Sequence, residues 1–539
     1  MLAHTGGQST RRTRSTGRTK YGADEKFGAD EAGFERSTLA TERRTAAMAD
    51  LQEWGKDDLP EPPPFNARNM LRVIGPGAIL LAASIGGGEW LIGPAIAVKH
   101  GSSLMWIATV GILLQVLFNL EGIRYTLYTG EPILSGIMRL RPGANFWATF
   151  YIVLTAAQLG VPALASGSSS VLFTLFSGRL PAENGSDSGA LIWITYGVIA
   201  AAFLLLTCGG TIERMLERLS WAMVAYIFAF LIVVNVIAVP WTHSFDTAAG
   251  FLKFGYIPRD VDWLLLAALA TTAGSGGIGN MTITNWVRDK GMGMGGRVGA
   301  IPSAIGGEHV ELSHVGKVFP VNAENLRRWH VWWQYVKADQ IWLWALGCFV
   351  GMYLNVNLAS AIIPPGSNME GQAAGAYQAD YLAKNLWSGL WYFGLLNGLW
   401  ILFSTHLGNT DVLVRTVTDA LWTASRRLRS NPRLGVGRLY YALLIGFTVW
   451  GFIVVNLAGA MTLFKILAAI AGLVLVPASI QVLRVNTRLL PPELRPSWWR
   501  RAALIACSAF YAAVSWAMLS SQLAPLWRKL GITVALVGG

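Results

Sequence analysis

Long apolar stretches, separated by shorter polar ones, are the feature that most limits what this chain can fold into. Each is long enough to cross about 30 Å of hydrocarbon at about 1.5 Å per residue of helix. We predict about eleven spans, at residues 70–98, 104–127, 146–176, 189–208, 216–240, 262–287, 335–357, 387–408, 438–457, 460–483 and 501–522. Only 14% of the 539 residues are charged, too few to cover a soluble protein of this size. The sequence therefore predicts an all-α polytopic membrane protein.

The segment before the predicted membrane domain, residues 67–525, differs from it in composition. Residues 1–66 are rich in charged residues, Thr, Ser and Gly, and they end in a Pro-rich run at 60–64. They contain no apolar core of the signal-peptide type. We predict a disordered tail and a stiff linker at 1–66, and a short C-terminal tail at 526–539.

The basic residues predict the orientation, because cytoplasmic loops carry an excess of Lys and Arg. If the N-terminus is cytoplasmic, most basic residues fall in cytoplasmic loops, at 139–141, 214–218, 288–328, 426–433 and 488–501. The opposite loops hold few, namely Lys99, Arg179, Lys253, Arg259 and Lys384. We expect a protein of the cell (inner) membrane with its N-terminus cytoplasmic and its C-terminus outside. The net charge of +12 is then a topology signal, and no nucleic acid partner is expected.

Residues typical of soluble metal sites and of enzymes are missing. Cys208, Cys348 and Cys507 lie far apart and form no CxxC pair, so neither a zinc site nor a disulfide framework is predicted. No HExxH, P-loop or Ser/His/Asp arrangement occurs. We expect no enzymatic activity and no cofactor.

Two predicted spans contain a cluster of glycines near the middle. The first span has Gly86, Gly87 and Gly88 followed by Glu89, and the sixth reads Gly274-Ser275-Gly276-Gly277-Ile278-Gly279-Asn280. Each glycine costs about 1 kcal/mol relative to alanine in a helix, so such clusters favour local unwinding. Spans one and six cross in opposite directions, as in two inverted five-helix repeats, here about 70–240 and 262–483, with an extra helix at about 501–522. The alternative is that the glycines only allow close helix packing.

At these stretches the chain resembles the Nramp family of divalent-metal transporters. The similarity lies in Gly75-Pro76-Gly77 ahead of the first cluster, and in Leu113-Leu114-Gln115 and Tyr128-Thr129-Gly130 of the second span. It extends over about residues 70–522 at low identity. The resemblance implies the amino-acid-transporter-like (LeuT-type) 5+5 inverted repeat with helices 1 and 6 broken.

The family's metal-binding residues are replaced in this chain. Its Asp-Pro-Gly-Asn falls on Gly86, Gly87, Gly88 and Glu89, and its Met-Pro-His falls on Gly277, Ile278 and Gly279. The resemblance places a carbonyl ligand on Gly274 and retains the family's Asn as Asn280. The third span contains no Asp or Glu, although the family has a proton-accepting carboxylate there. The chain is thus an atypical match that lacks the usual Asp and Met ligands, and proton coupling is not expected.

Glu89 is the sharpest candidate for binding a cation. An ionisable group this far into a span usually faces the bundle interior. If Gly86, Gly87 and Gly88 are unwound, its carboxylate points into the break. The alternative is a structural carboxylate that caps the second half-helix.

The predicted site would use oxygen ligands. Its candidate ligands are Glu89, Gly86, Gly274, Gly277 and Asn280, and the glycines that expose them are Gly87, Gly88, Gly276 and Gly279. Oxygen ligands without sulfur favour Mg²⁺, Mn²⁺ or Ca²⁺ over softer metals.

Other polar residues within spans are candidates for a gate or for coupling. Glu121 and Arg124, three apart, are expected to pair. Lys465 is expected to reach the outer interface, and Asn409 and Asp411 to line a cytoplasmic vestibule. Lys337 and Asp339 are expected at the boundary of the seventh span. Glu308, His309, Glu311 and His314 lie in a loop at 288–333 that we predict to be solvated rather than metal-binding.

The function that fits these observations is secondary transport of a divalent metal cation, Mg²⁺ or Mn²⁺, by alternating access. A first alternative is a transporter of the same fold for a small organic solute such as an amino acid, whose carboxylate the half-helix amides would hold. A second is a membrane sensor that does not transport. The expected partners are the lipid bilayer and the metal substrate, and the sequence leaves the oligomeric state open.

Overall fold

The apolar stretches form helices because a bilayer offers no water to backbone amides and carbonyls, which must then bond within each segment. The computed structural model describes residues 51–158, 160–208, 211–258, 261–301, 313, 315–369, 371–431 and 433–529. The elements up to the sixth span are β1 (Gly55–Lys56), α2 (Ala67–Val73), α3 (Pro76–Ser84), η1 (Gly87–Ile92), α4 (Gly93–His100), η2 (Ser102–Leu104), α5 (Trp106–Thr129), α6 (Ile133–Met138), α7 (Ala144–Ala157), α8 (Pro162–Ser177), α9 (Ser188–Thr207), α10 (Ile212–Ala238), α11 (Trp241–Gly250) and α12 (Trp263–Thr272). The later elements are α13 (Ile278–Asp289), η3 (Gly293–Arg297), β2 (Lys317–Val318), α14 (Ala323–Lys337), η4 (Ala338–Ala345), α15 (Leu346–Ile362), α16 (Tyr377–Asn385), α17 (Leu390–Ala424), α18 (Arg426–Arg429), α19 (Val436–Val454), α20 (Ala460–Arg488), η5 (Pro492–Leu494) and α21 (Trp498–Lys529).

Nine helical stretches in the described part of the chain are long and apolar enough to cross a membrane. The interrupted pair α12 and α13, and the 35-residue helix α17, supply the two further spans that the sequence predicts. The protein is therefore an integral membrane protein, and its polytopic helical fold is confirmed.

Three predicted spans have different bounds in the structure. The seventh begins at Ala323 instead of residue 335, because α14, η4 and α15 form one 40-residue run despite its polar first turns. The eighth continues to Ala424 instead of ending at 408. The third is two helices, α7 and α8, separated by a turn around Gln158.

The segment at 1–66, predicted to be a disordered tail and a stiff linker, is ordered from residue 51 onward. β1 pairs in parallel with β2, with Gly55 opposite Lys317, and Leu59 is fully buried. The prediction of disorder does not hold for residues 51–59, because β1 pairs with β2 and Leu59 is buried, while the Pro-rich run at 60–64 accepts hydrogen bonds from α14. Residues 1–50 lie outside the described residues. At the other terminus α21 continues to Lys529, so the predicted tail at 526–539 begins as helix, and 530–539 lie outside the described residues.

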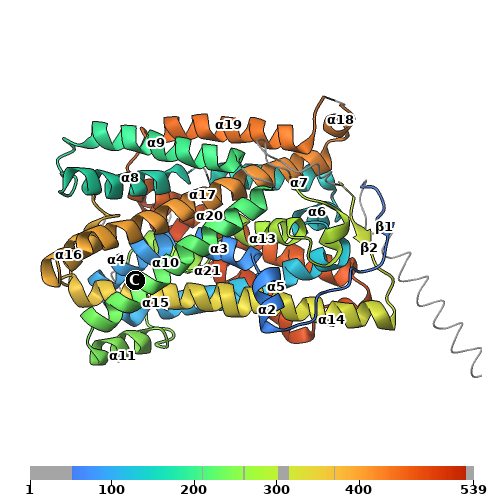
Figure 1. The fold of residues 1–539 in the computed structure, drawn as a ribbon, viewed down its shortest axis with the longest axis horizontal. Helices are drawn as coiled ribbons and strands as arrows, with labels where there is room; N and C mark the ends of the chain where they lie inside the picture. The colour runs from blue at the N-terminus through green and yellow to red at the C-terminus, as the bar shows by residue number, and fades with distance from the viewer. Residues whose placement is uncertain are drawn as a thin grey trace, which may run out of the picture. The chain divides into compact units, whose positions relative to one another are not determined.

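Figure 1 shows how the elements lie along the bundle. The helices α11 and α16 lie at one end, and α18, the start of α14 and the β1–β2 pair lie at the other. We call these the α11–α16 end and the β1–β2 end. By the distribution of basic residues, the β1–β2 end is the one predicted to be cytoplasmic.

Candidate functional site

The first break separates α3 from η1. Ile85 (ψ 85°) and Gly86 (φ −154°, ψ −120°) leave the helical conformation, and a π-helical turn resumes at Gly87. The break is therefore present but shorter than expected. Gly87 and Gly88 lie inside helical structure, which corrects the prediction that all three glycines are unwound. The Ile85 carbonyl accepts a hydrogen bond from the Thr405 hydroxyl at 3.1 Å.

Close packing explains why glycine occupies this break. A Cβ atom at Gly86 would strike the Thr405 side chain, one at Gly87 would strike the Phe464 ring, and one at Gly88 would strike the Thr272 carbonyl. These neighbours belong to α17, α20 and α12. The alternative considered from the sequence, that the glycines allow tight packing, therefore holds together with the break.

The second break, between α12 and α13, is longer. Gly276 and Gly277 have φ of +70° and +53°, which residues with a side chain rarely adopt. Gln115 of α5 holds the break on both sides, because its Oε1 accepts from the Gly276 amide at 3.1 Å and its Nε2 donates to the Thr271 carbonyl at 3.1 Å. The Tyr511 hydroxyl of α21 also donates to the Ala270 carbonyl at 3.0 Å. Two other spans thus satisfy the polar groups that the break frees.

Glu89 is fully buried and directed back to the first break. Its Oε2 accepts a hydrogen bond from the Gly86 amide at 3.1 Å, so the side chain caps η1. Its Oε1 has no hydrogen-bond partner in the described structure. The geometry supports the capping interpretation, and it leaves one carboxylate oxygen available. A role as cargo ligand stays a prediction.

A small cavity of about 40 Å³ lies between the two breaks. Its polar lining consists of hydroxyl and amide side chains from four spans, namely Ser84, Gln158, Thr271, Thr272, Ser275, Thr405 and Asn409. Of the predicted site residues, Gly87, Gly88 and Gly274 line it. Glu89, Gly86, Gly276, Gly277, Gly279 and Asn280 are not among its lining residues.

Most of this polar lining was missed from the sequence. Ser and Thr are common in membrane helices, where they bond to carbonyls of the preceding turn, as Thr271 does with Ala267 at 2.9 Å. Their presence in a span is therefore a weak signal. Asn409 is the exception, because the sequence predicts that it lines a cytoplasmic vestibule. In the structure it lines the inner cavity instead.

Asn280 belongs to a chain of buried side chains that leads away from the break. Its Nδ2 donates to Asn119 at 2.9 Å, Asn119 donates to Gln340 at 3.0 Å, and Gln340 donates to Asp339 at 2.8 Å. The Asp339 carboxylate accepts the amides of Gly75 and Gly77, at 3.0 and 2.8 Å, and so caps α3. The expectation that Asp339 lies at the boundary of the seventh span stays a prediction, and only 1% of the residue is exposed.

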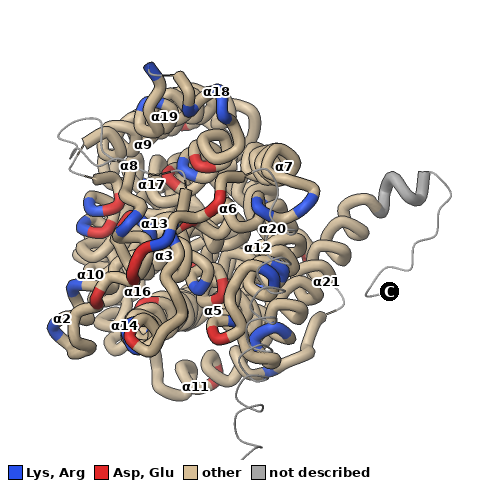
Figure 2. Tube along the Cα trace, turned by 90° about the vertical axis from the view of Figure 1, so that its right-hand side faces the viewer, with Lys and Arg blue, Asp and Glu red and all other residues tan. Residues whose placement is uncertain are grey.

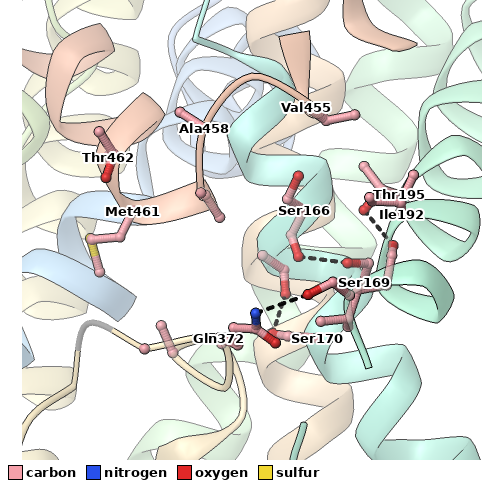
Figure 3. Close-up of a pocket in the computed structure, with 18 of the residues that line it drawn as sticks. Ser166, Ser169, Ser170, Ile192, Thr195, Gln372, Val455, Ala458, Met461 and Thr462 are labelled. Carbon is pink, nitrogen blue, oxygen red and sulfur yellow. Dashed lines mark hydrogen bonds between the residues drawn. The ribbon is translucent and has the colours of Figure 1, made fainter. Parts of the chain in front are cut away.

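A wider vestibule of about 530 Å³ opens at the α11–α16 end (Figure 3). Hydroxyl-bearing residues dominate its polar lining, and Ser166, Ser169, Ser170, Thr195 and Thr462 are among them. Among the described residues that line it, Glu183 alone is charged, and its two oxygens accept the Tyr377 hydroxyl at 2.6 Å and the Gln372 amide at 3.2 Å.

Phe464 stands between this vestibule and the inner cavity. Met461 and Thr462, which line the vestibule, lie within one turn of Phe464 on α20, and Phe464 lines the cavity. Its ring packs on Gly87 of the first break and is 4% exposed. The cavity is therefore closed on this side by one aromatic side chain and its neighbours.

Acidic and basic residues gather at the opposite, β1–β2 end, which faces the viewer in Figure 2. There Asp411 is fully buried, bonds to Arg415 at 2.9 Å, and accepts the Trp286 indole at 2.8 Å and the Tyr440 hydroxyl at 2.7 Å. Arg415 also contacts Asp289. The expectation that Asp411 lines a vestibule is wrong, because every polar atom of its carboxylate is engaged inside the bundle.

The remaining candidates lie away from the two breaks. Glu121 and Arg124 pair at 2.8 Å as predicted, and Arg500 joins the same carboxylate at 2.9 Å. Lys465 lies 4.0 Å from Asp262. Their roles in gating or coupling stay predictions.

The loop candidates Glu308, His309, Glu311 and His314 lie outside the described residues. Within the described residues, no group of three or more His, Cys, Asp or Glu side chains is arranged to hold a metal ion.

No protein-family model and no curated protein matches the chain. Solved structures do match it. The manganese transporter of Eremococcus coleocola, in complex with an aromatic bis-isothiourea substituted compound, is 13% identical over 89% of this chain and 92% of that one, with a TM-score of 0.61. A mutant of that transporter gives 14% identity over 89% and 91%, with a TM-score of 0.60. The chain therefore has the fold of that manganese transporter, the LeuT-type fold that its sequence predicts.

Proposed function

We propose that the protein is a secondary transporter that carries a divalent metal cation, Mg²⁺ or Mn²⁺, across the membrane by alternating access. The observation that carries the proposal is the small cavity between two interrupted helices, whose polar lining consists of hydroxyl and amide groups and contains no sulfur. Oxygen donors suit hard cations. The shared fold with a manganese transporter supports the same proposal.

Charge balance in the proposed site comes from Glu89. The lining itself is neutral, and a bare divalent ion among neutral groups is expensive in a low-dielectric interior. Glu89 follows directly on Gly88, which lines the cavity, and its Oε1 lacks a hydrogen-bond partner. The carboxylate stabilises the ion either as a direct ligand or through the intervening backbone.

The α11–α16 end is proposed as the loading side. The vestibule there leads to Phe464, whereas the β1–β2 end is closed by buried ion pairs. With the N-terminus cytoplasmic, cargo enters from outside and leaves toward the cytoplasm.

A small organic solute is the second candidate, and one observation favours it. None of the residues that line the inner cavity is charged, whereas cation sites in proteins commonly include carboxylates. Against it stands the size of the cavity, since about 40 Å³ holds an ion or a water but not an amino acid.

The test is uptake by the purified protein in proteoliposomes, measured cation by cation with Mn²⁺, Mg²⁺, Ca²⁺ and Zn²⁺, and in parallel with labelled amino acids. We expect saturable uptake of Mn²⁺ or Mg²⁺ that amino acids do not inhibit. Amino acid uptake without cation uptake would favour the second candidate. Absence of flux for every compound, in vesicles that hold folded protein, would contradict a transport function.

A further inference from the structure

Residues 51–65 form a strap along the β1–β2 end, and we call them the N-terminal strap. Near its start, Trp54 stacks under the Arg139 guanidinium at 4.8 Å and packs against Tyr125 and Tyr128. Arg139 also donates to the Gln52 carbonyl at 2.9 Å. These contacts attach the strap to the ends of α5 and α6.

The middle of the strap pairs with β2 and the start of α14. The Gly55 amide donates to the Gly316 carbonyl at 3.1 Å, and the Asp57 amide donates to the Val318 carbonyl at 3.1 Å. Leu59, fully buried, donates its amide to Asn325 at 3.3 Å. The strap therefore completes a two-stranded sheet and places one apolar anchor inside the protein.

The Pro-rich part follows α14 toward the first span. The Trp332 indole donates to the Pro60 carbonyl at 2.9 Å, and the Tyr335 hydroxyl donates to the Pro64 carbonyl at 2.9 Å. Phe65 then packs edge-on against Tyr335, with ring centroids 5.0 Å apart. A polyproline conformation leaves its carbonyls free for such donors.

Exposed ion pairs reinforce the strap. Asp57 bonds to Lys317 at 3.1 Å, and Glu61 bonds to Arg327 at 2.8 Å and to Arg328 at 2.6 Å. The hydrogen bond from Lys317 lowers the pKa of Asp57, and the one from Arg327 lowers the pKa of Glu61, so both acids are ionised at neutral pH.

The strap ends just before the first half of the interrupted first span. After Asn66, the chain enters α2 and then α3, a nine-residue helix that the break at 85–86 separates from the rest of the span. Ala83 and Ser84 at the far end of α3 line the inner cavity. The Asp339 cap holds the near end of α3 against η4, and the strap, which leads into α2, bonds to α14.

We propose that the N-terminal strap is an internal clamp that keeps the β1–β2 end of the cavity closed, and that it must detach from β2 and α14 before α3 can pivot and release cargo. This inference rests on the proposed transport function. It adds a regulatory element from outside the stretch, about 70–522, that resembles metal transporters.

A reversible covalent lock tests the clamp through uptake. Gly55 and Lys317 are opposite each other in the two-stranded sheet, where strands lie about 4.8 Å apart, within the usual Cα range of a disulfide. The double variant Gly55→Cys/Lys317→Cys is made in a Cys208→Ser background, since Cys208 is the exposed native thiol of the described chain. We expect uptake to be lost on oxidation and restored by reductant. The single variant Gly55→Cys is the matched control and should respond to neither treatment.

A second measurement separates the clamp from the transport assignment. Two exposed residues, Leu71 on α2 and Arg427 on α18, can carry spin labels. The distance between the labels reports the position of α2 and the adjoining α3, and no cargo is needed. We expect one distance in the parent chain and an additional distance in Asp57→Asn/Glu61→Gln, growing with ionic strength because exposed pairs are screened.

The two readouts decide separate questions. Full uptake by the oxidised double variant, or an unchanged distance distribution in the charge-removed variant, would overturn the clamp. If the parent chain carries no cargo at all, the proposed function fails, and the distance measurement still decides whether the strap restrains the helix.

Discussion

At the scale of single residues, the two oxygens of Glu89 have different surroundings. Oε2 caps η1 through the Gly86 amide, and Oε1 has no partner in the described structure. Glu89→Gln retains an acceptor for the Gly86 amide while it removes the negative charge. We predict that this variant keeps its thermal stability within a few degrees and loses Mn²⁺ uptake about tenfold or more, because about 1.4 kcal/mol of lost charge stabilisation already gives a factor of ten.

Glu89→Ala separates the two roles further. It removes the cap as well as the charge, so its unfolding temperature should fall relative to Glu89→Gln. Unchanged uptake by Glu89→Gln, measured in proteoliposomes of equal protein content, would exclude Glu89 from charge balance.

Asp339 is the residue on which the start of the first span depends. It accepts two backbone amides of α3 and one side-chain amide, all inside the bundle. Asp339→Asn places a donor against one of those amides, and we predict a loss of about 1–3 kcal/mol in unfolding free energy. The measurement is denaturant unfolding in detergent. Asp187→Asn, which breaks an exposed pair with Arg179, is the control and should change stability by less than about 1 kcal/mol.

At the scale of elements, the second break depends on a backbone conformation. Gly277 has φ of +53°, and a Cβ there would strike the Ala471 carbonyl. We predict that Gly277→Ala destabilises the protein by at least about 1–2 kcal/mol, the cost of a left-handed conformation, and abolishes uptake. Gly446→Ala is the matched control, since a Cβ at that position in α19 meets nothing within 4 Å. It should be neutral or stabilising by up to about 1 kcal/mol. Equal behaviour of the two variants, in thermal unfolding and uptake, would contradict this account.

The sequence located both breaks because the signal is local. Three or four glycines within seven residues of an apolar span strongly disfavour a continuous helix. It did not locate the cavity lining, because Gln158, Thr405 and Phe464 reach the breaks from the third, eighth and tenth spans. Single-sequence reasoning does not see which face of a uniformly apolar helix turns inward, and a hydroxyl bonded within its own helix gives no further hint.

The surroundings of two buried acids were missed for a related reason. The burial of Asp339 and Asp411 inside the bundle was not predicted, because buried charges in spans are rare. Each is compensated by partners far away in sequence, Asp339 by Gly75 and Gly77, and Asp411 by Trp286 and Tyr440. The N-terminal strap was missed likewise, since its partners are distant in sequence, 87 residues away for Gln52 and Arg139 and 266 for Leu59 and Asn325.

At the scale of the whole molecule, acid is expected to loosen the β1–β2 end. Burial raises the pKa of Glu131, but attraction to Arg139 and hydrogen bonds from Arg139 and Tyr125 outweigh it, so the pKa lies below the ordinary 4.5. Because this pKa is lower in the folded state, ionised Glu131 stabilises the fold. That stabilisation is complete above about pH 4.5 and is lost as the pH falls through the pKa of the folded state. We predict that the stability difference between the parent chain and Glu131→Gln shrinks below pH 4.5. Thermal unfolding in detergent from pH 7 to pH 3 measures it, and a constant difference would contradict the prediction.

The vestibule at the α11–α16 end has a kinetic consequence for any cargo. Among the described residues that line it, Glu183 is the one acid, whereas electrostatic steering requires a mouth with a strong field of one sign. We therefore expect the described lining to steer ions only weakly, so that they arrive mainly by diffusion. Changing the salt concentration on that side should leave the initial rate of loading nearly constant. Discrimination between competing ions then depends on the inner cavity that Phe464 covers.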